Sequence, residues 1–140
     1  MMDRAALEAL GRRWMQLWQG GDLSLFEATH APDFSDESSA GRGTDCAAFG
    51  RGVAQLYRAF PDFTATIEAM VVDETQAMAA IRWRATGTQN GPFLGLVASG
   101  AGISFDGIEI IACRGGQVTR RWGHWDEAAL LGQMTRRLEP

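Results

Sequence analysis

The stretch RWRATGTQNGPFLGLVASGAGISFDGIEI, residues 82–110, decides the fold of this 140-residue chain. Its two ends alternate apolar with polar side chains, which is typical of half-buried β-strands. We therefore expect strands over residues 78–88 and 100–114, joined by a glycine-rich loop. Large apolar side chains on neighbouring strands of this kind are suited to lining a pocket for an apolar organic molecule.

The rest of the chain adds further strands and helices around this pair. Alternation predicts strands over 63–71 and 118–125, with a hairpin turn at 114–117. Helical spacing predicts a first helix between Asp3 and Gly20, a short helix after Asp22, and helices over 44–59 and 127–138. The proline-containing segment 30–34 is expected to be a break, followed by a loop over 35–43. Helices, then consecutive strands, then a helix indicate one α+β domain over 1–140, with an antiparallel sheet.

Composition narrows the possible partners of the chain. The net charge of −4 argues against a nucleic-acid partner, which usually requires a basic surface. No apolar run approaches the roughly 20 residues that span a membrane, and the first residues lack a secretory pattern, so we expect a cytoplasmic protein. All 13 basic residues are arginines, which excludes Schiff-base chemistry on a lysine.

Cysteines and histidines do not suggest a metal centre. Cys46 and Cys113 are expected to be buried thiols, and His30 and His124 lie far apart in the sequence. None of the four residues forms a spacing typical of zinc ligands. We therefore expect neither a metal nor a cofactor.

Candidate catalytic groups gather at the end of the last predicted strand. Asp126 directly precedes a helix, so it either caps that helix or serves as a general base. His124 lies two residues away, on the same side of an extended strand as Trp122, and could share a proton with Asp126.

Glu109 is a third candidate, because its strand face is otherwise apolar or small. That face holds Phe105, Gly107, Ile111 and Cys113. The carboxylate is therefore expected either to lie in the pocket or to pair with an arginine of a neighbouring strand, namely Arg82, Arg84 or Arg120. Two other acids, Asp36 and Glu37, are expected to be solvated in a loop or to lie at the pocket mouth.

A strongly curved sheet would leave a gap between its concave face and the first helix, and this gap is the expected ligand site. Aromatic side chains near it are expected to form core or pocket wall. The pocket candidates are Trp14, Trp18, Phe34, Trp83, Phe93 and Trp122.

Taken in order, these segments resemble the SnoaL-like polyketide cyclases of the nuclear transport factor 2-like superfamily. The resemblance rests on the tryptophan-bearing first helix and on motifs along nearly the whole chain. These motifs are Pro32-Asp33-Phe34, Ala59-Phe60-Pro61-Asp62-Phe63, Arg82-Trp83, Phe93-Leu94-Gly95, Gly107-Ile108 and Trp125-Asp126. The resemblance implies a cone-shaped curved sheet packed against N-terminal helices, a deep apolar pocket for a hydrophobic small molecule, and a homodimer.

The resemblance also implies a reaction, an intramolecular aldol cyclisation by a carboxylate acid/base without a metal. The chain departs from the family pattern at the loop, where Gln89 replaces a histidine and Pro92-Phe93 replaces Glu-Phe. The family's catalytic aspartate matches either Asp126 or the position of Gly123. Two other functions therefore remain open: a non-catalytic dimeric ligand-binding module and a ketosteroid-isomerase-like isomerase.

Overall fold

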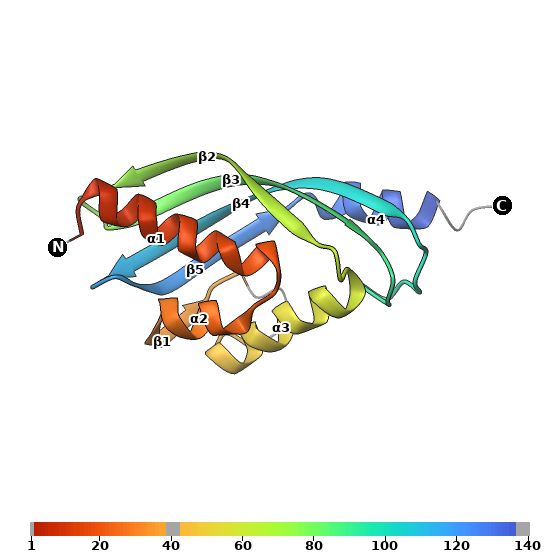
Figure 1. Ribbon diagram of the computed structural model, residues 1–140, viewed down its shortest axis with the longest axis horizontal. Coiled ribbons are helices and arrows are strands. Elements are labelled where there is room, and N and C mark those ends of the chain that lie inside the picture. Colours follow the sequence, from red (N-terminus) through yellow and green to blue (C-terminus); the bar gives the residue numbers. More distant parts are fainter. Residues whose placement is uncertain (1, 39–42, 137–140) are drawn as a thin grey trace.

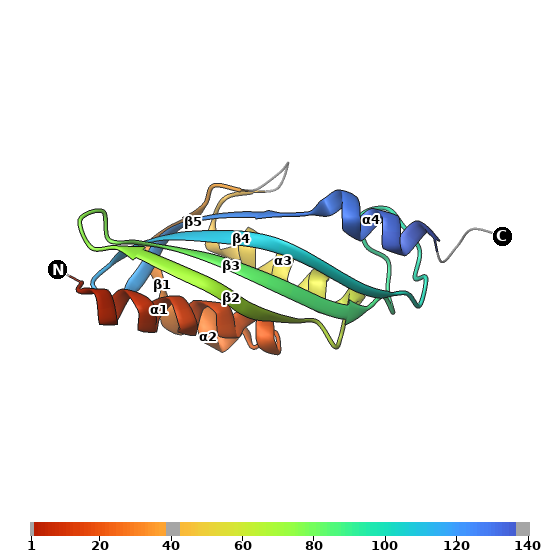
Figure 2. The same ribbon diagram turned by 90° about the horizontal axis from the view of Figure 1, so that it is seen from above.

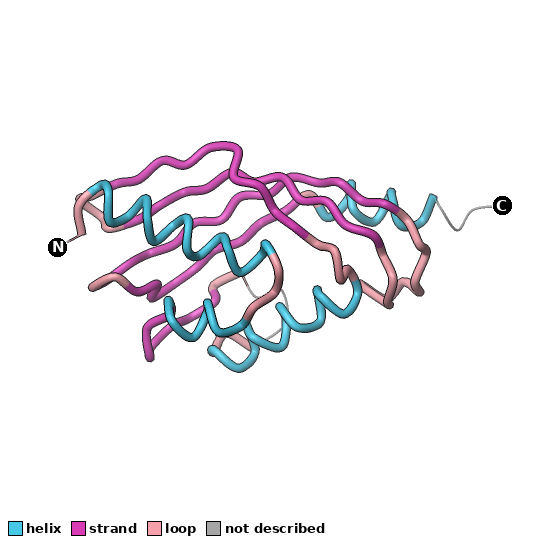
Figure 3. Tube along the Cα trace, viewed as in Figure 1, coloured by secondary structure: helices cyan, strands magenta, loops and turns pink. Residues whose placement is uncertain are grey.

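The computed structural model describes residues 2–38 and 43–136 and has an α+β fold (Figures 1 and 3). Along the chain, the elements are α1 (Arg4–Gln16) with a 3-10 turn (Leu17–Gln19), α2 (Leu23–Thr29), β1 (His30–Asp36), α3 (Cys46–Ala59), β2 (Thr64–Asp73), β3 (Met78–Thr88), β4 (Gly102–Arg114), β5 (Gln117–Trp125) and α4 (Glu127–Arg136). The predicted α+β class is confirmed. The predicted last two residues of the final helix, 137 and 138, lie outside the described part of the chain.

The described strands form one sheet in the order β1-β5-β4-β3-β2. β2, β3, β4 and β5 are antiparallel neighbours, as predicted. The segment expected to be a break is instead strand β1, which pairs with β5 in parallel. Pro32 is compatible with this strand because β1 lies at the sheet edge and Pro32 falls between His30 and Ser35, where the pairing with β5 shifts register.

Aspartates cap the first three α-helices. The side chains of Asp3, Asp22 and Asp45 accept hydrogen bonds from free backbone amides in the first turns of α1, α2 and α3. The predicted starts of α1 and α2 are therefore confirmed, whereas α3 begins two residues later than expected.

Helix α1 runs along one face of the sheet, and α4 lies at its far end, beyond β5 (Figures 1 and 2). Leu7, Leu10 and Trp14 of α1 are almost fully buried against the strands. The β2–β3 and β4–β5 ladders each contain a register shift, and such bulges bend the strands that carry them. None of the described helices is long and apolar enough to cross a membrane.

Candidate functional site

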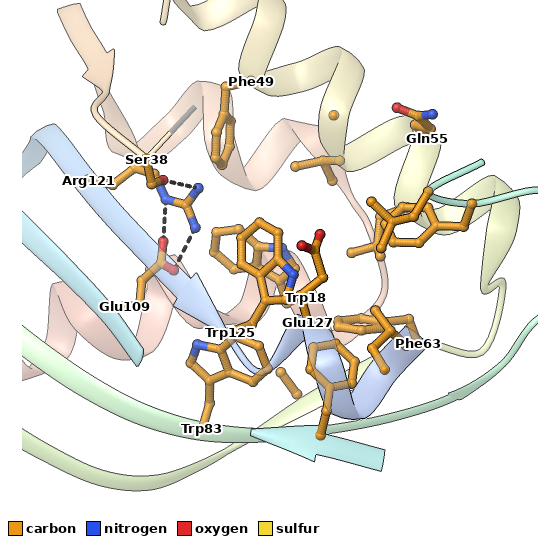
Figure 4. A pocket seen from close by; sticks show the side chains of 18 of the residues that line it. Trp18, Ser38, Phe49, Gln55, Phe63, Trp83, Glu109, Arg121, Trp125 and Glu127 are labelled. Atoms are coloured by element: carbon orange, nitrogen blue, oxygen red, sulfur yellow. Dashed lines mark hydrogen bonds and ion pairs between the residues drawn. The ribbon is translucent and has the colours of Figure 1, made fainter. Parts of the chain in front are cut away.

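A cavity of about 360 Å³ opens between the sheet, the end of α1, helix α3 and the start of α4. This volume lies within the usual range for small-molecule sites. Most of the wall is apolar (Figure 4). Its aromatic side chains are Trp18, Phe49, Phe63, Trp83, Phe93, Phe105 and Trp125.

The polar part of the wall is a buried ion pair between neighbouring strands β4 and β5. Arg121 Nε donates to Glu109 Oε1 and Arg121 Nη2 donates to Glu109 Oε2, each at 2.6 Å. Trp14 Nε1 adds a third hydrogen bond to Glu109 Oε1 at 2.9 Å. The Arg121 and Glu109 side chains are 5% and 2% exposed, so both charges depend on partners within the protein.

Asp36 and Ser38, from the end of β1 and the turn after it, complete the surroundings of Arg121. Arg121 Nη1 lies 3.3 Å from Asp36 Oδ1 and donates to Ser38 Oγ at 3.1 Å. Burial by itself would lower the pKa of Arg121, but the charges and hydrogen bonds of Glu109 and Asp36 outweigh it and raise this pKa above its usual value. Arg121 is therefore a permanent cation at the pocket wall.

Two glycines make room for the largest groups of this wall. Gly123 lies opposite Glu109 in the β4–β5 ladder, and a Cβ atom there would overlap the Arg121 guanidinium and crowd Glu109. Gly107 lies opposite Trp83 in the β3–β4 ladder, and a Cβ atom there would overlap the indole ring. The absence of a side chain at these two glycines therefore leaves the space that the ion pair and Trp83 occupy.

The loop between β3 and β4 forms part of the pocket mouth. Gln89 is fully buried, and its amide donates to the backbone oxygens of Gly91 and Val97 and accepts from the Ser99 hydroxyl at 2.6 Å. Leu94, near the tip of this loop, lines the cavity. Gln89, at the position where the family pattern has a histidine, thus holds the loop in shape through these hydrogen bonds.

The structure places only some of the predicted site residues at the cavity. Glu109, Trp18, Trp83 and Phe93 line it. Trp14 and Phe34 are buried in the aromatic cluster beside it, and Trp14 reaches the site through Glu109.

The other predicted residues lie elsewhere, and the alternation of β5 explains why. Arg121 and Trp125 line the cavity, so Trp122 and His124 project from the opposite face of the sheet. His124 is exposed, and Trp122 stacks with Arg120.

The expectation that Asp126 and His124 form a pair in the pocket is therefore not met. Asp126 is exposed, and its carboxylate accepts from the backbone N–H of Ala129 at 3.0 Å. This is the capping role that the sequence also allowed.

Two further predictions need correction. Glu109 pairs with Arg121, whereas the exposed Arg82, Arg84 and Arg120 lie on the other face of their strands. Asp36 is not a solvated loop acid but is completely buried. The alternation of side chains along β5 could have identified Arg121, since Arg121 shares a face with Trp125. Nothing local in the sequence distinguishes Asp36 from the exposed Glu37.

The described residues contain no group of three or more histidine, cysteine or acidic side chains that could hold a metal ion. The buried charges of the site are those of Arg121 and its two carboxylate partners, Glu109 and Asp36.

Comparison with known proteins identifies the family. The profile of the SnoaL-like polyketide cyclases matches residues 8–134. The chain belongs to this family. No protein of curated function matches its sequence.

Solved structures share the fold at low sequence identity. A candidate SnoaL-like polyketide cyclase from Jannaschia sp. CCS1 is 21% identical, with a TM-score of 0.85 and full coverage of both chains. TsrD from Streptomyces laurentii is 22% identical and AclR from Streptomyces galilaeus, a candidate hydroxylase, is 23% identical. Both have a TM-score of 0.85 and cover 96% of this chain and 98% of their own. These likenesses show that the chain shares its α+β fold with these proteins.

Proposed function

We propose that the chain is a cofactor-independent enzyme of the cyclase type, in which Glu109 is the general acid/base. The observation that supports this proposal is a buried carboxylate in the wall of an otherwise aromatic cavity of about 360 Å³. A carbon between two carbonyl groups is already acidic, so a positioned carboxylate is a sufficient base. The substrate is a hydrophobic compound with a 1,3-dicarbonyl unit and a further carbonyl group, and it fits between the aromatic walls.

In the proposed reaction, the Glu109 carboxylate takes a proton from the carbon between two carbonyls. The resulting enolate attacks a third carbonyl of the same molecule and forms the new carbon–carbon bond. Glu109 then returns its proton to the alkoxide that this attack creates. Protons balance over the cycle, and Glu109 ends in its starting form.

The position of Glu109 supports this choice over Asp126 and His124. Glu109 lies directly across the ladder from Gly123, one of the two positions that match the family's catalytic aspartate. Its carboxylate thus occupies space beside that position from the neighbouring strand. We propose that the acid/base carboxylate of this chain comes from β4, whereas the family pattern has it on β5.

Exchange of an acidic carbon-bound hydrogen tests the first step. We expect the protein to accelerate the exchange of the α-hydrogens of 2-tetralone in D2O, followed by proton NMR. Glu109→Gln should reduce this acceleration by about 100-fold or more, since general-base catalysis contributes that much. Circular dichroism verifies that the variant is folded.

Two matched acids provide the controls. Asp106→Asn changes an exposed carboxylate on the same strand, and Asp126→Asn changes the capping acid of α4. Both should retain the wild-type exchange rate. Equal exchange by wild-type protein and Glu109→Gln would remove Glu109 from the mechanism.

One observation favours a second function, that of a ligand-binding module without turnover. Both Glu109 oxygens already accept hydrogen bonds, from Arg121 and Trp14. AclR, named as a candidate hydroxylase, also illustrates that one scaffold serves different functions. A module of this kind would be stabilised by 2-tetralone in a thermal melt but would leave its hydrogen exchange at the solution rate.

We also propose a homodimer formed through the outer face of the sheet. Ile108 is 48% exposed there, and the half-buried Trp122 lies on the neighbouring strand, opposite Ile110. Exposed apolar surface of this kind often marks a protein interface. Analytical ultracentrifugation should show a dimer that Ile108→Glu converts to a monomer, whereas a wild-type monomer at all concentrations would contradict the proposal.

A further inference from the structure

Arg121 has one more hydrogen-bond donor than the described residues use. A guanidinium carries five N–H groups in a fixed plane. Nε and one N–H of Nη2 donate to Glu109, while Nη1 faces Asp36 and Ser38. The second N–H of Nη2 has no acceptor within residues 2–38 and 43–136.

Two aromatic rings lie on one side of the same guanidinium. Its Cζ lies 5.5 Å from the centroid of the Trp18 ring and 5.3 Å from that of Phe49. The two ring centroids are only 5.9 Å apart, so both rings lie on the same side of Arg121. A ligand oxygen can accept a hydrogen bond from Arg121 only at its edge, because the N–H groups lie in the plane of the guanidinium. Figure 4 shows this edge between Glu109 and the aromatic part of the wall.

The other polar side chains of the wall lie in different settings. Gln55 and Glu127 are exposed residues of α3 and α4, and Ser38 already accepts from Arg121 Nη1. The remaining side chains of the wall are apolar, apart from the neutral indole N–H donors of Trp18, Trp83 and Trp125. Arg121 is therefore the charged donor that the wall offers to an oxygen atom on an otherwise apolar ligand.

We propose that Arg121 Nη2 is the anchor for a carbonyl oxygen of an uncharged, planar ketone, and thus a residue that determines specificity. This inference rests on the proposed function of the cavity as a small-molecule site. It adds that the carbonyl group points toward β5, while the ring system lies between the aromatic walls. A charge-assisted hydrogen bond at that oxygen would also stabilise the enolate that Glu109 generates.

Binding of two isosteric probes tests the proposal without any turnover. 2-Acetylnaphthalene and 2-isopropenylnaphthalene differ by replacement of the carbonyl oxygen with a methylene group. We expect the ketone to bind wild-type protein about 10-fold more tightly or better, because a hydrogen bond to a charged group contributes that much. Calorimetry measures both dissociation constants, and equal values would overturn the proposal.

Gly123→Ala tests the assignment to Arg121, because the added methyl group displaces the guanidinium from its seat. The ketone preference should fall to within about 2-fold, with binding of the hydrocarbon probe largely retained. Gly102→Ala on β4, where a Cβ atom meets open space, is the matched control and should keep the full preference. A folded Gly123→Ala variant with an unchanged ketone preference would assign the anchor elsewhere. Where this variant does not fold, the wild-type comparison decides alone.

The two proposals fail independently. A ketone preference without accelerated exchange of 2-tetralone supports the anchor and removes the catalytic function. Accelerated exchange without a ketone preference removes the anchor and leaves Glu109 as the base.

Discussion

Trp14 of helix α1 and Glu109 of strand β4 are joined by a 2.9 Å hydrogen bond between Nε1 and Oε1, although they lie 95 residues apart. This bond connects the N-terminal helix to the middle of the sheet at the buried ion pair. The indole ring is 1% exposed and packs on Trp18, Phe34 and Phe49. Trp14 is therefore both part of the core and a support for the site carboxylate.

Replacing Trp14 with Phe should lower the free energy of unfolding by about 1–3 kcal/mol, because a buried hydrogen bond to a charged group is lost. Urea denaturation measures the change. Trp122→Phe on the outer face is the matched control, and its effect should be clearly smaller. Equal losses in the two variants would show that the Glu109 contact contributes nothing to stability.

Adjacent arginines on opposite faces of β5 should differ in their effect on stability. Arg121→Leu leaves two buried carboxylates without this partner and should cost about 3–5 kcal/mol. Arg120→Leu removes an exposed pair with Glu37 and should cost less than about 1 kcal/mol. Thermal and urea unfolding of both variants test this order, which similar losses would contradict.

Gln89→Leu should loosen the β3–β4 loop without unfolding the sheet. The variant keeps the apolar bulk of the side chain but loses its hydrogen bonds to Gly91, Val97 and Ser99. Amides of residues 90–99 should exchange faster with deuterium, while those of β3 and β4 stay protected. Unchanged exchange in the loop would show that its shape does not depend on the Gln89 amide.

Burial raises the pKa of the Cys113 thiol to about 11, from 9.0. The neutral thiol is therefore favoured in the folded state, and its contribution is fully present below pH 9 and lost as the pH rises toward 11. We expect stability to fall over this window, by up to about 2 kcal/mol. Cys113→Ala should flatten the decline, and identical pH profiles would contradict the assignment to Cys113.

Periodicity predicted the elements of this fold that bury a continuous apolar face. The alternation over 78–88 matches β3 without error, and the helical spacing of Leu7, Leu10 and Trp14 matches the buried side of α1. Strand β1 was missed because its register with β5 comes from tertiary pairing. A proline-containing edge strand has little local signal.

The candidate site was predicted only in part, because its residues depend on which face of the sheet each strand side chain occupies. Glu109 was identified because a charged residue on an apolar face needs a buried partner. The position of Asp126 did not distinguish between its two possible roles. An aspartate at the end of a strand and the start of a helix is suited both to capping and to catalysis. Arg121 was missed as the partner of Glu109 because cross-strand register decides which arginine lies within reach.

The β3–β4 loop is closed at its base by two backbone hydrogen bonds, from Gln89 to Ala101 and from Gly100 to Gln89. Insertions or deletions in the loop between these positions should therefore not disturb the strands that carry the ion pair. Relatives of this chain could therefore acquire new ligand preferences by exchanging one short segment while the ion pair of Glu109 and Arg121 stays in place, and an engineer could do likewise by grafting.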